Sequence, residues 1–147
     1  MNILSLDIAT KTGFKTKNAS GTWDLKSKRD ESGGMRLLRF RSKLIEIMGI
    51  EKIDIVVYER VAGFHKGAII VASELVGVLK SFCEDHKLEY KAYSAGEIKK
   101  FATGKGNANK EKMIEACIEK YGITPIDDNE ADAIHLFHLA VSDLMPT

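Results

Sequence analysis

Two short and almost continuous apolar runs dominate the hydrophobic pattern. They cover residues 3–8 and 53–58, and each is too short for a helix but suited to a strand that is buried on both faces. Between and after these runs, apolar residues recur at steps of three and four, as on one face of an amphipathic helix. The pattern predicts buried parallel strands that are joined by crossover helices.

Two further strands are expected directly after the first run. Residues 13–16 and 21–25 alternate and contain β-branched and aromatic side chains, with turn residues at 18–21 between them. A short strand is also expected at 88–93. Helices are expected near 37–49, 68–83, 95–102, 110–121 and 129–145. The expected fold class is therefore α/β: a mixed sheet of three antiparallel N-terminal strands plus two parallel strands, with helices on both faces.

The composition is that of an ordinary globular domain. With 147 residues, the chain is long enough to bury one core, so a single domain spanning residues 1–147 is expected. No apolar run approaches the ~18 residues of a membrane span. The first run lacks a basic leader, so no signal peptide is expected. Cys83 and Cys117 fall within helix patterns, which favours reduced thiols in a cytoplasmic protein.

The distribution of charge is more informative than its total. The 22 basic and 21 acidic residues nearly cancel, which gives no indication of a polyanionic partner. However, lysines gather in residues 11–29 and 99–112, whereas acidic residues gather at 127–132. This separation suits a basic binding surface around an acidic centre, although solvated helix faces are an equally good explanation of any single lysine.

Each of the two apolar runs has an acid at or next to its carboxyl end. Asp7 interrupts the first run, and Glu59 follows the second. An ionised carboxylate costs several kcal/mol to bury unless it is paired. Neighbouring central strands bring such side chains together, and a divalent cation between the carboxylates would relieve their repulsion. Oxygen donors without a His or Cys cluster favour Mg²⁺ or Mn²⁺ over zinc.

A second pair of acids lies at the start of the last expected helix. Asp128 and Asp132 are four residues apart and therefore share a helix face. Helix capping is an alternative explanation, because residues 129–132 resemble a capping box and acids are favoured at a helix N-terminus. Two strand acids that converge with a helical pair are typical of a two-metal phosphodiester centre, in which the ions lie ~3.5–4 Å apart.

Four segments, taken in order, carry a family resemblance. They are LDIATKTG at 6–13, VYER at 57–60, GKGNANKE at 104–111 and EADAI at 130–134. In these four segments the chain resembles the RuvC group of Holliday junction resolvases, which belongs to the ribonuclease H-like superfamily. The resemblance is strongest to the shorter, phage-encoded members of that group. The resemblance implies a crossover junction endodeoxyribonuclease of DNA recombination and repair, located in the cytoplasm of a bacterium or of a phage-infected host.

The resemblance also implies a set of catalytic, metal-binding acids. Asp7, Glu59 and Asp132 match the family's ligands. Many members have an Asp or His three residues before the last acid, where this chain has Asn129, and others have a carboxylate four residues before it, as Asp128 is here. We prefer Asp128 as the fourth ligand, with Asn129 or Glu130 as alternatives. Two Mg²⁺ ions per site are implied, with Mn²⁺ able to substitute.

The expected DNA contacts lie in two loops and the helix starts that follow them. They are Phe64, His65, Lys66, Lys105 and Lys110. The two later lysines are expected to contact phosphate, unless they are merely solvent-exposed. Phe64 is expected to stack in the opened junction, the alternative being a loop anchor in a local core. A four-way junction has two symmetry-related strands to cut, which implies a homodimer, and the resemblance places its contact on the long helix after Phe64.

Two other functions fit part of this pattern. A nuclease with broader specificity for branched DNA, such as forks and flaps, would use the same acids. An ATP-binding domain of the actin and sugar-kinase type also begins with a strand that carries Asp, Thr and Gly, but it needs two such domains to enclose ATP. A non-enzymatic nucleic-acid-binding module is disfavoured because all the required acids are present.

Overall fold

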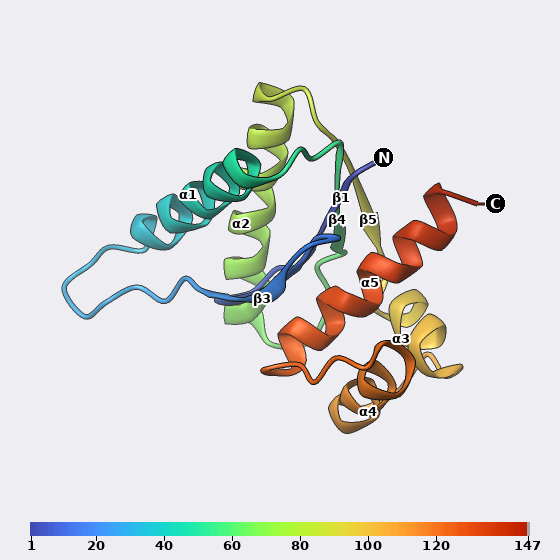
Figure 1. Cartoon of the computed structure of the whole chain (residues 1–147). Helices are drawn as coiled ribbons and strands as arrows, with labels where there is room; N and C mark the ends of the chain where they lie inside the picture. The colour runs from blue at the N-terminus through green and yellow to red at the C-terminus, as the bar shows by residue number, and fades with distance from the viewer. Residues whose placement is uncertain (147) are drawn as a thin grey trace.

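A five-stranded mixed sheet forms the centre of the computed structural model, which describes residues 1–146 (Figure 1). The strand order is β3-β2-β1-β4-β5. β1 pairs antiparallel with β2 and parallel with β4, β2 pairs antiparallel with β3, and β4 pairs parallel with β5. The strands are β1 (Ile3–Asp7), β2 (Lys11–Lys15), β3 (Ser20–Asp24), β4 (Ile55–Glu59) and β5 (Glu89–Tyr93). The predicted mixed sheet is thus confirmed.

Helices cover both faces of the sheet, as predicted. Two of them, α1 and α2, pack on one face, and α5 crosses the other, with α3 and α4 beside it (Figure 1). The helices are α1 (Gly34–Ile50), α2 (Lys66–Asp85), α3 (Ala95–Thr103), α4 (Lys110–Tyr121) and α5 (Asp128–Leu144). Within residues 1–146, no helix combines the length and apolar character that a membrane crossing requires.

The alternation of side chains along β1 and β4 decides which face receives the acids. Leu4 and Leu6 belong to the cluster under α1 and α2, whereas Ile3, Ile55 and Val57 belong to the cluster under α5. Successive strand residues point to opposite faces, so Asp7 and Glu59 point to the α5 face. The register pairs Ile3 with Ile55, which brings the ends of both strands to the same edge.

Gly13 on β2 allows α5 to lie close to the sheet. It pairs with Asp7 on β1, and a Cβ added there would lie 1.9 Å from the carbonyl oxygen of Asn129. No side chain fits at such a distance. The absence of a side chain therefore lets the first turn of α5 rest directly on the β2 backbone, next to the carboxyl end of β1.

The start of α5 differs in detail from the expectation. The expected capping box at 129–132 is not formed, because Asp127 caps the helix and its carboxylate accepts a hydrogen bond from the backbone N–H of Glu130. β4 is also shorter than the apolar run that predicted it. It begins at Ile55, although Ile53 is buried as well. Cys83 and Cys117 are buried free thiols, as the helix patterns indicated.

Candidate metal centre

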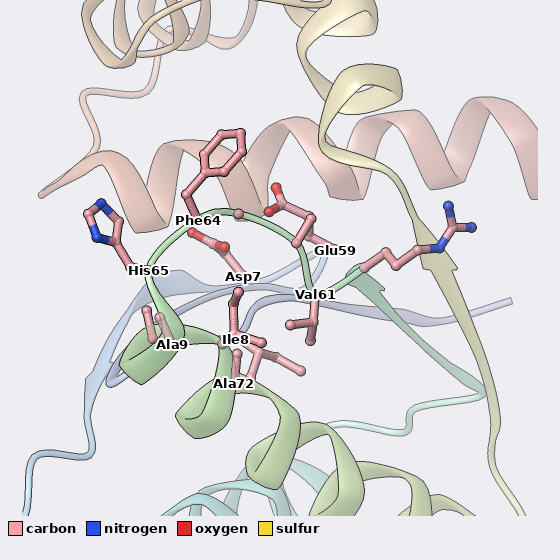
Figure 2. A pocket seen from close by; sticks show the side chains of 13 residues that line it. Asp7, Ile8, Ala9, Glu59, Val61, Phe64, His65 and Ala72 are labelled. Atoms are coloured by element: carbon pink, nitrogen blue, oxygen red, sulfur yellow. The ribbon is translucent and has the colours of Figure 1, made fainter.

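Three acids from distant parts of the chain meet at one end of the sheet. Asp7 ends β1, Glu59 ends β4, and Asp132 lies one turn into α5. One carboxylate oxygen of each lies within 4.8 Å of the others. The sequence predicted this meeting from the two apolar runs and the helical pair. Figure 2 shows the Asp7 and Glu59 carboxylates beside the loop that follows β4.

The three carboxylates are crowded and poorly compensated. Burial raises the pKa of Asp7 well above its usual range, and the nearby charges of Asp132 and Glu59 raise it further. Burial and the charge of Glu59 raise the pKa of Asp132 to about 7. The pKa of Glu59 is also raised by burial, an effect that Lys99 partly opposes. Three crowded oxygen donors of this kind fit a divalent cation such as Mg²⁺ or Mn²⁺.

The raised pKa of Asp132 predicts how stability depends on pH without metal. The folded-state pKa lies above 3.8, so folding favours the protonated form. The free energy of unfolding therefore falls as the pH rises from about 4 to about 7, and this loss is complete above that range. Asp132→Asn removes this charge. We expect the variant to be more stable than the unmodified protein at pH 8 by on the order of 2–4 kcal/mol, and the difference to shrink toward pH 4.

Urea unfolding of both proteins in EDTA, from pH 4 to pH 8, measures this effect. The relevant quantity is the difference in the free energy of unfolding between the two proteins. Burial lowers the pKa values of His135 and His138, which makes each protein more stable as the pH rises, and this opposite trend cancels in the difference. A difference that stays constant across this range would contradict the raised pKa of Asp132.

Asp128 lies beside the three acids rather than among them. Its carboxylate is 3.6 Å from the ammonium of Lys110 at the start of α4. Both residues line a cleft of about 310 Å³ together with Glu59 and Asp132. The charge of Asp128 contributes to the raised pKa values of Asp7 and Asp132. Asp128 is thus at the edge of the centre, one helical turn from Asp132.

The two alternatives to Asp128 are placed differently. The backbone carbonyl of Asn129 lies against Gly13. Glu130 is 7% exposed, and its carboxylate accepts hydrogen bonds from the Ser20 hydroxyl and from the backbone N–H of Ile126, both at 2.6 Å. The side chain of Glu130 is therefore occupied by contacts with β3 and with the segment before α5.

No protein-family model matches the sequence. Solved structures, in contrast, match the fold over most of the chain. RuvC from Thermus thermophilus superposes with a TM-score of 0.77 and 17% identity, over 99% of this chain and 97% of that one. The chain has the ribonuclease H-like fold of RuvC.

Two further structures share this RuvC-like fold. The T. thermophilus RuvC in complex with a Holliday junction substrate has a TM-score of 0.75 and 17% identity, over 92% of this chain and 90% of that one. The yeast mitochondrial Holliday junction resolvase Ydc2 has a TM-score of 0.65 and 9% identity, over 91% of this chain and 75% of that one. The fold is retained at very low sequence identity.

The loop after β4 borders the acids on a second side. Asp7 and Glu59 line a cleft of about 230 Å³ together with Phe64 and His65 (Figure 2). The Phe64 side chain is fully exposed, at 101%, so it is not a loop anchor in a local core. The loop turns at Gly63, which has a φ of +123°, and His65 and Lys66 form the start of α2.

Lys99 is a basic residue at this site that the sequence analysis did not single out. It lines the same cleft as Glu59, Asp132 and Lys110, whereas Lys105 is exposed in the loop between α3 and α4. A signal was available in the sequence. The Ser94 capping box fixes the start of α3 directly after β5, beside the end of β4, and a residue one turn later faces the acids.

Proposed function

We propose that the protein is a structure-selective DNA endonuclease that resolves four-way (Holliday) junctions by metal-dependent phosphodiester hydrolysis. The observation that carries this proposal is the convergence of Asp7, Glu59 and Asp132 at one end of a RuvC-like fold. A fold alone does not specify a function. The three acids are therefore stronger support for a nuclease than the structural similarity to RuvC. The junction substrate bound by T. thermophilus RuvC supports the substrate class.

The acids are the residues that would hold the metal. We assign Asp7, Glu59 and Asp132 as ligands, with Asp128 as the fourth, and two Mg²⁺ ions, replaceable by Mn²⁺, as the cofactor. When bound, such ions supply an activated water and stabilise the charge on the leaving oxygen, with a 5′-phosphate and a 3′-hydroxyl as products. The raised pKa values of Asp7 and Asp132 imply that metal binding releases protons from the site.

Basic residues would bind and orient the DNA backbone. Lys99 and Lys110 line the cleft next to Glu59 and Asp132, so their ammonium groups are placed to contact oxygens of the scissile or adjacent phosphate. Lys105 is exposed in the loop between α3 and α4, and His65 and Lys66 are exposed at the start of α2. These three residues would contact phosphates further along the strands. These residues position the strand without reading its sequence.

Phe64 would act as a stacking wedge in the opened junction. We expect Phe64→Ala to lower the rate of junction cleavage roughly 5- to 150-fold, since one base–aromatic stack is worth about 1–3 kcal/mol. The urea midpoint should not change, because the side chain is fully exposed. Single-turnover cleavage of a labelled junction measures the effect. Phe64→Trp is the matched control and should retain the rate, whereas an equal loss in both variants would contradict stacking.

The symmetry of a four-way junction suggests that the active form is a homodimer, with one metal centre for each strand that is cut. We assign the contact to α2, which follows the Phe64 loop. An apolar groove between α1 and α2, lined by Leu37, Leu38, Gly77 and Val78, supports this choice. A sedimentation experiment that finds only monomers at the concentrations at which junctions are cut would contradict the dimer.

Substrate selectivity tests the proposal against broader branched-DNA cleavage. The protein is incubated with an immobile four-way junction, a replication fork, a flap and a linear duplex, in Mg²⁺ or Mn²⁺. Cleavage confined to the four-way junction is expected. Equal rates on forks and flaps would favour the broader nuclease. If none of the substrates is cut with either metal, the proposal is wrong.

A further inference from the structure

Glu130 is a buried acid that contributes no atom to the cluster of Asp7, Glu59 and Asp132. One oxygen of its carboxylate accepts the Ser20 hydroxyl at 2.6 Å, and the other accepts the backbone N–H of Ile126, also at 2.6 Å. Both oxygens are therefore occupied within the protein. A buried carboxylate that is held at both oxygens is fixed in orientation, and losing a partner is costly.

The residues around Glu130 fasten the same helical turn to the sheet. Asp127 caps α5 by accepting from the backbone N–H of Glu130 at 2.9 Å, and the same oxygen accepts the Thr22 hydroxyl at 2.8 Å. Ser20 and Thr22 are two residues apart on the edge strand β3 and so point to one face. Together with the close approach at Gly13, these bonds attach the turn that contains Asp128 to β2 and β3.

Electrostatic repulsion acts against this attachment. Asp128 and Asp132 project from α5 toward the end of β1, where Asp7 lies, and these carboxylates repel one another when they are ionised. Repulsion between like charges tends to separate the helix from the strands. The bonds from β3 to Asp127 and Glu130 lie on the same turn as Asp128 and oppose that separation directly.

We propose that Glu130 is a positioning residue whose hydrogen bond with Ser20 fixes the first turn of α5, so that Asp132 and Asp128 are held against Asp7 and Glu59 for metal binding. This inference rests on the proposed metal centre and deepens it. It gives Glu130 a role other than that of a fourth ligand. It also makes β3, which contributes no ligand, part of the metal-binding apparatus.

Mn²⁺ binding without DNA, measured by isothermal titration calorimetry, tests the inference. Glu130→Ala and Ser20→Ala should each weaken Mn²⁺ affinity by about 10-fold or more, as is typical when residues that orient ligands are removed. Glu130→Gln should bind within about threefold of the unmodified protein, because an amide can accept from Ile126 and donate to Ser20. Ser20→Ala removes only a hydroxyl, so it keeps the test valid if Glu130→Ala fails to fold.

Glu51→Ala is a matched control at the turn between β2 and β3, close to Ser20 but at the end of these strands away from the acids. The Glu51 carboxylate accepts from the Thr16 hydroxyl at 2.5 Å and from the Asn18 amide at 3.0 Å, so its loss breaks a bond of the same kind as Ser20–Glu130. It should lower the urea midpoint and leave Mn²⁺ affinity unchanged. A reduction of Mn²⁺ affinity in this control as large as in Glu130→Ala would show that general destabilisation is the cause.

Three results separate the possible failures. If Glu130→Ala and Ser20→Ala bind Mn²⁺ as tightly as the unmodified protein, the positioning role is wrong and the metal centre stands. If Glu130→Gln loses as much affinity as Asp132→Asn, Glu130 is a ligand and the inference is overturned. If the unmodified protein does not bind Mn²⁺, the proposed function fails and this inference fails with it.

Discussion

Replacing Asp7 with asparagine is expected to abolish cleavage of a four-way junction, with a loss of at least ~10³-fold in the single-turnover rate. Asp7 lies close to both the strand acid Glu59 and the helix acid Asp132, and the charges of both raise its pKa. An amide at this position has the shape of the carboxyl but lacks the charge that two divalent cations require. Denaturing gels of an end-labelled junction in Mg²⁺ measure the loss.

Two controls accompany the Asp7→Asn variant. Junction binding in a gel-shift assay should be retained, because the basic residues around the cleft are unchanged. Asp30→Asn alters an exposed acid in the segment between β3 and α1 and should cleave at the unmodified rate. Cleavage by Asp7→Asn at a rate close to that of the unmodified protein would remove the acids from the mechanism.

Lys110→Met is expected to lower the cleavage rate by about 10²- to 10³-fold, the range found when one group that stabilises transition-state charge is removed. The ammonium of Lys110 lies at the mouth of the acidic cleft, 3.6 Å from Asp128, where it is placed to meet a phosphate oxygen. Mn²⁺ affinity should not fall, because the variant removes a cation from the site rather than a ligand. Single-turnover rates and calorimetry separate the two effects.

Lys112→Met is the matched control for Lys110. Both lysines lie in the first turn of α4 and are exposed, but Lys112 lies 3.7 Å from Glu115 and lines a different surface between α3 and α4. Its replacement should change the cleavage rate by less than about threefold, in line with the small contribution of an exposed ion pair. Equal losses in the two variants would indicate general attraction of DNA to α4 and not a specific contact.

Much of the fold and the central part of the site could be predicted from the sequence. The strands β1 and β4 are apolar on both faces, so each single acid stood out against its neighbours. Strand alternation and parallel pairing then brought Asp7 and Glu59 to one edge. Helical spacing placed Asp128 and Asp132 on one face, and the resemblance to the RuvC group matched Asp132 to a metal ligand. Local periodicity, the rule that central strands are neighbours and this resemblance were together sufficient.

The remaining details depend on tertiary contacts. The expected cap of α5 was displaced because the carboxylate of Asp127, already bonded to Thr22 on β3, also caps the helix. Glu130 is oriented toward Ser20, a residue 110 positions away. Local patterns do not specify such side-chain directions. Lys99 is a different case, because the Ser94 capping box fixes the start of α3 after β5 and the sequence analysis did not use that signal.

The positions of the nicks in an immobile four-way junction test the central claim most directly. In Mg²⁺ or Mn²⁺, the account predicts paired nicks at symmetry-related positions in two strands, with 5′-phosphate ends that a ligase can seal. No nicks should form in EDTA or with Asp7→Asn. Nicking that persists in EDTA, or that is equally strong on linear duplex, would contradict a metal-dependent junction resolvase.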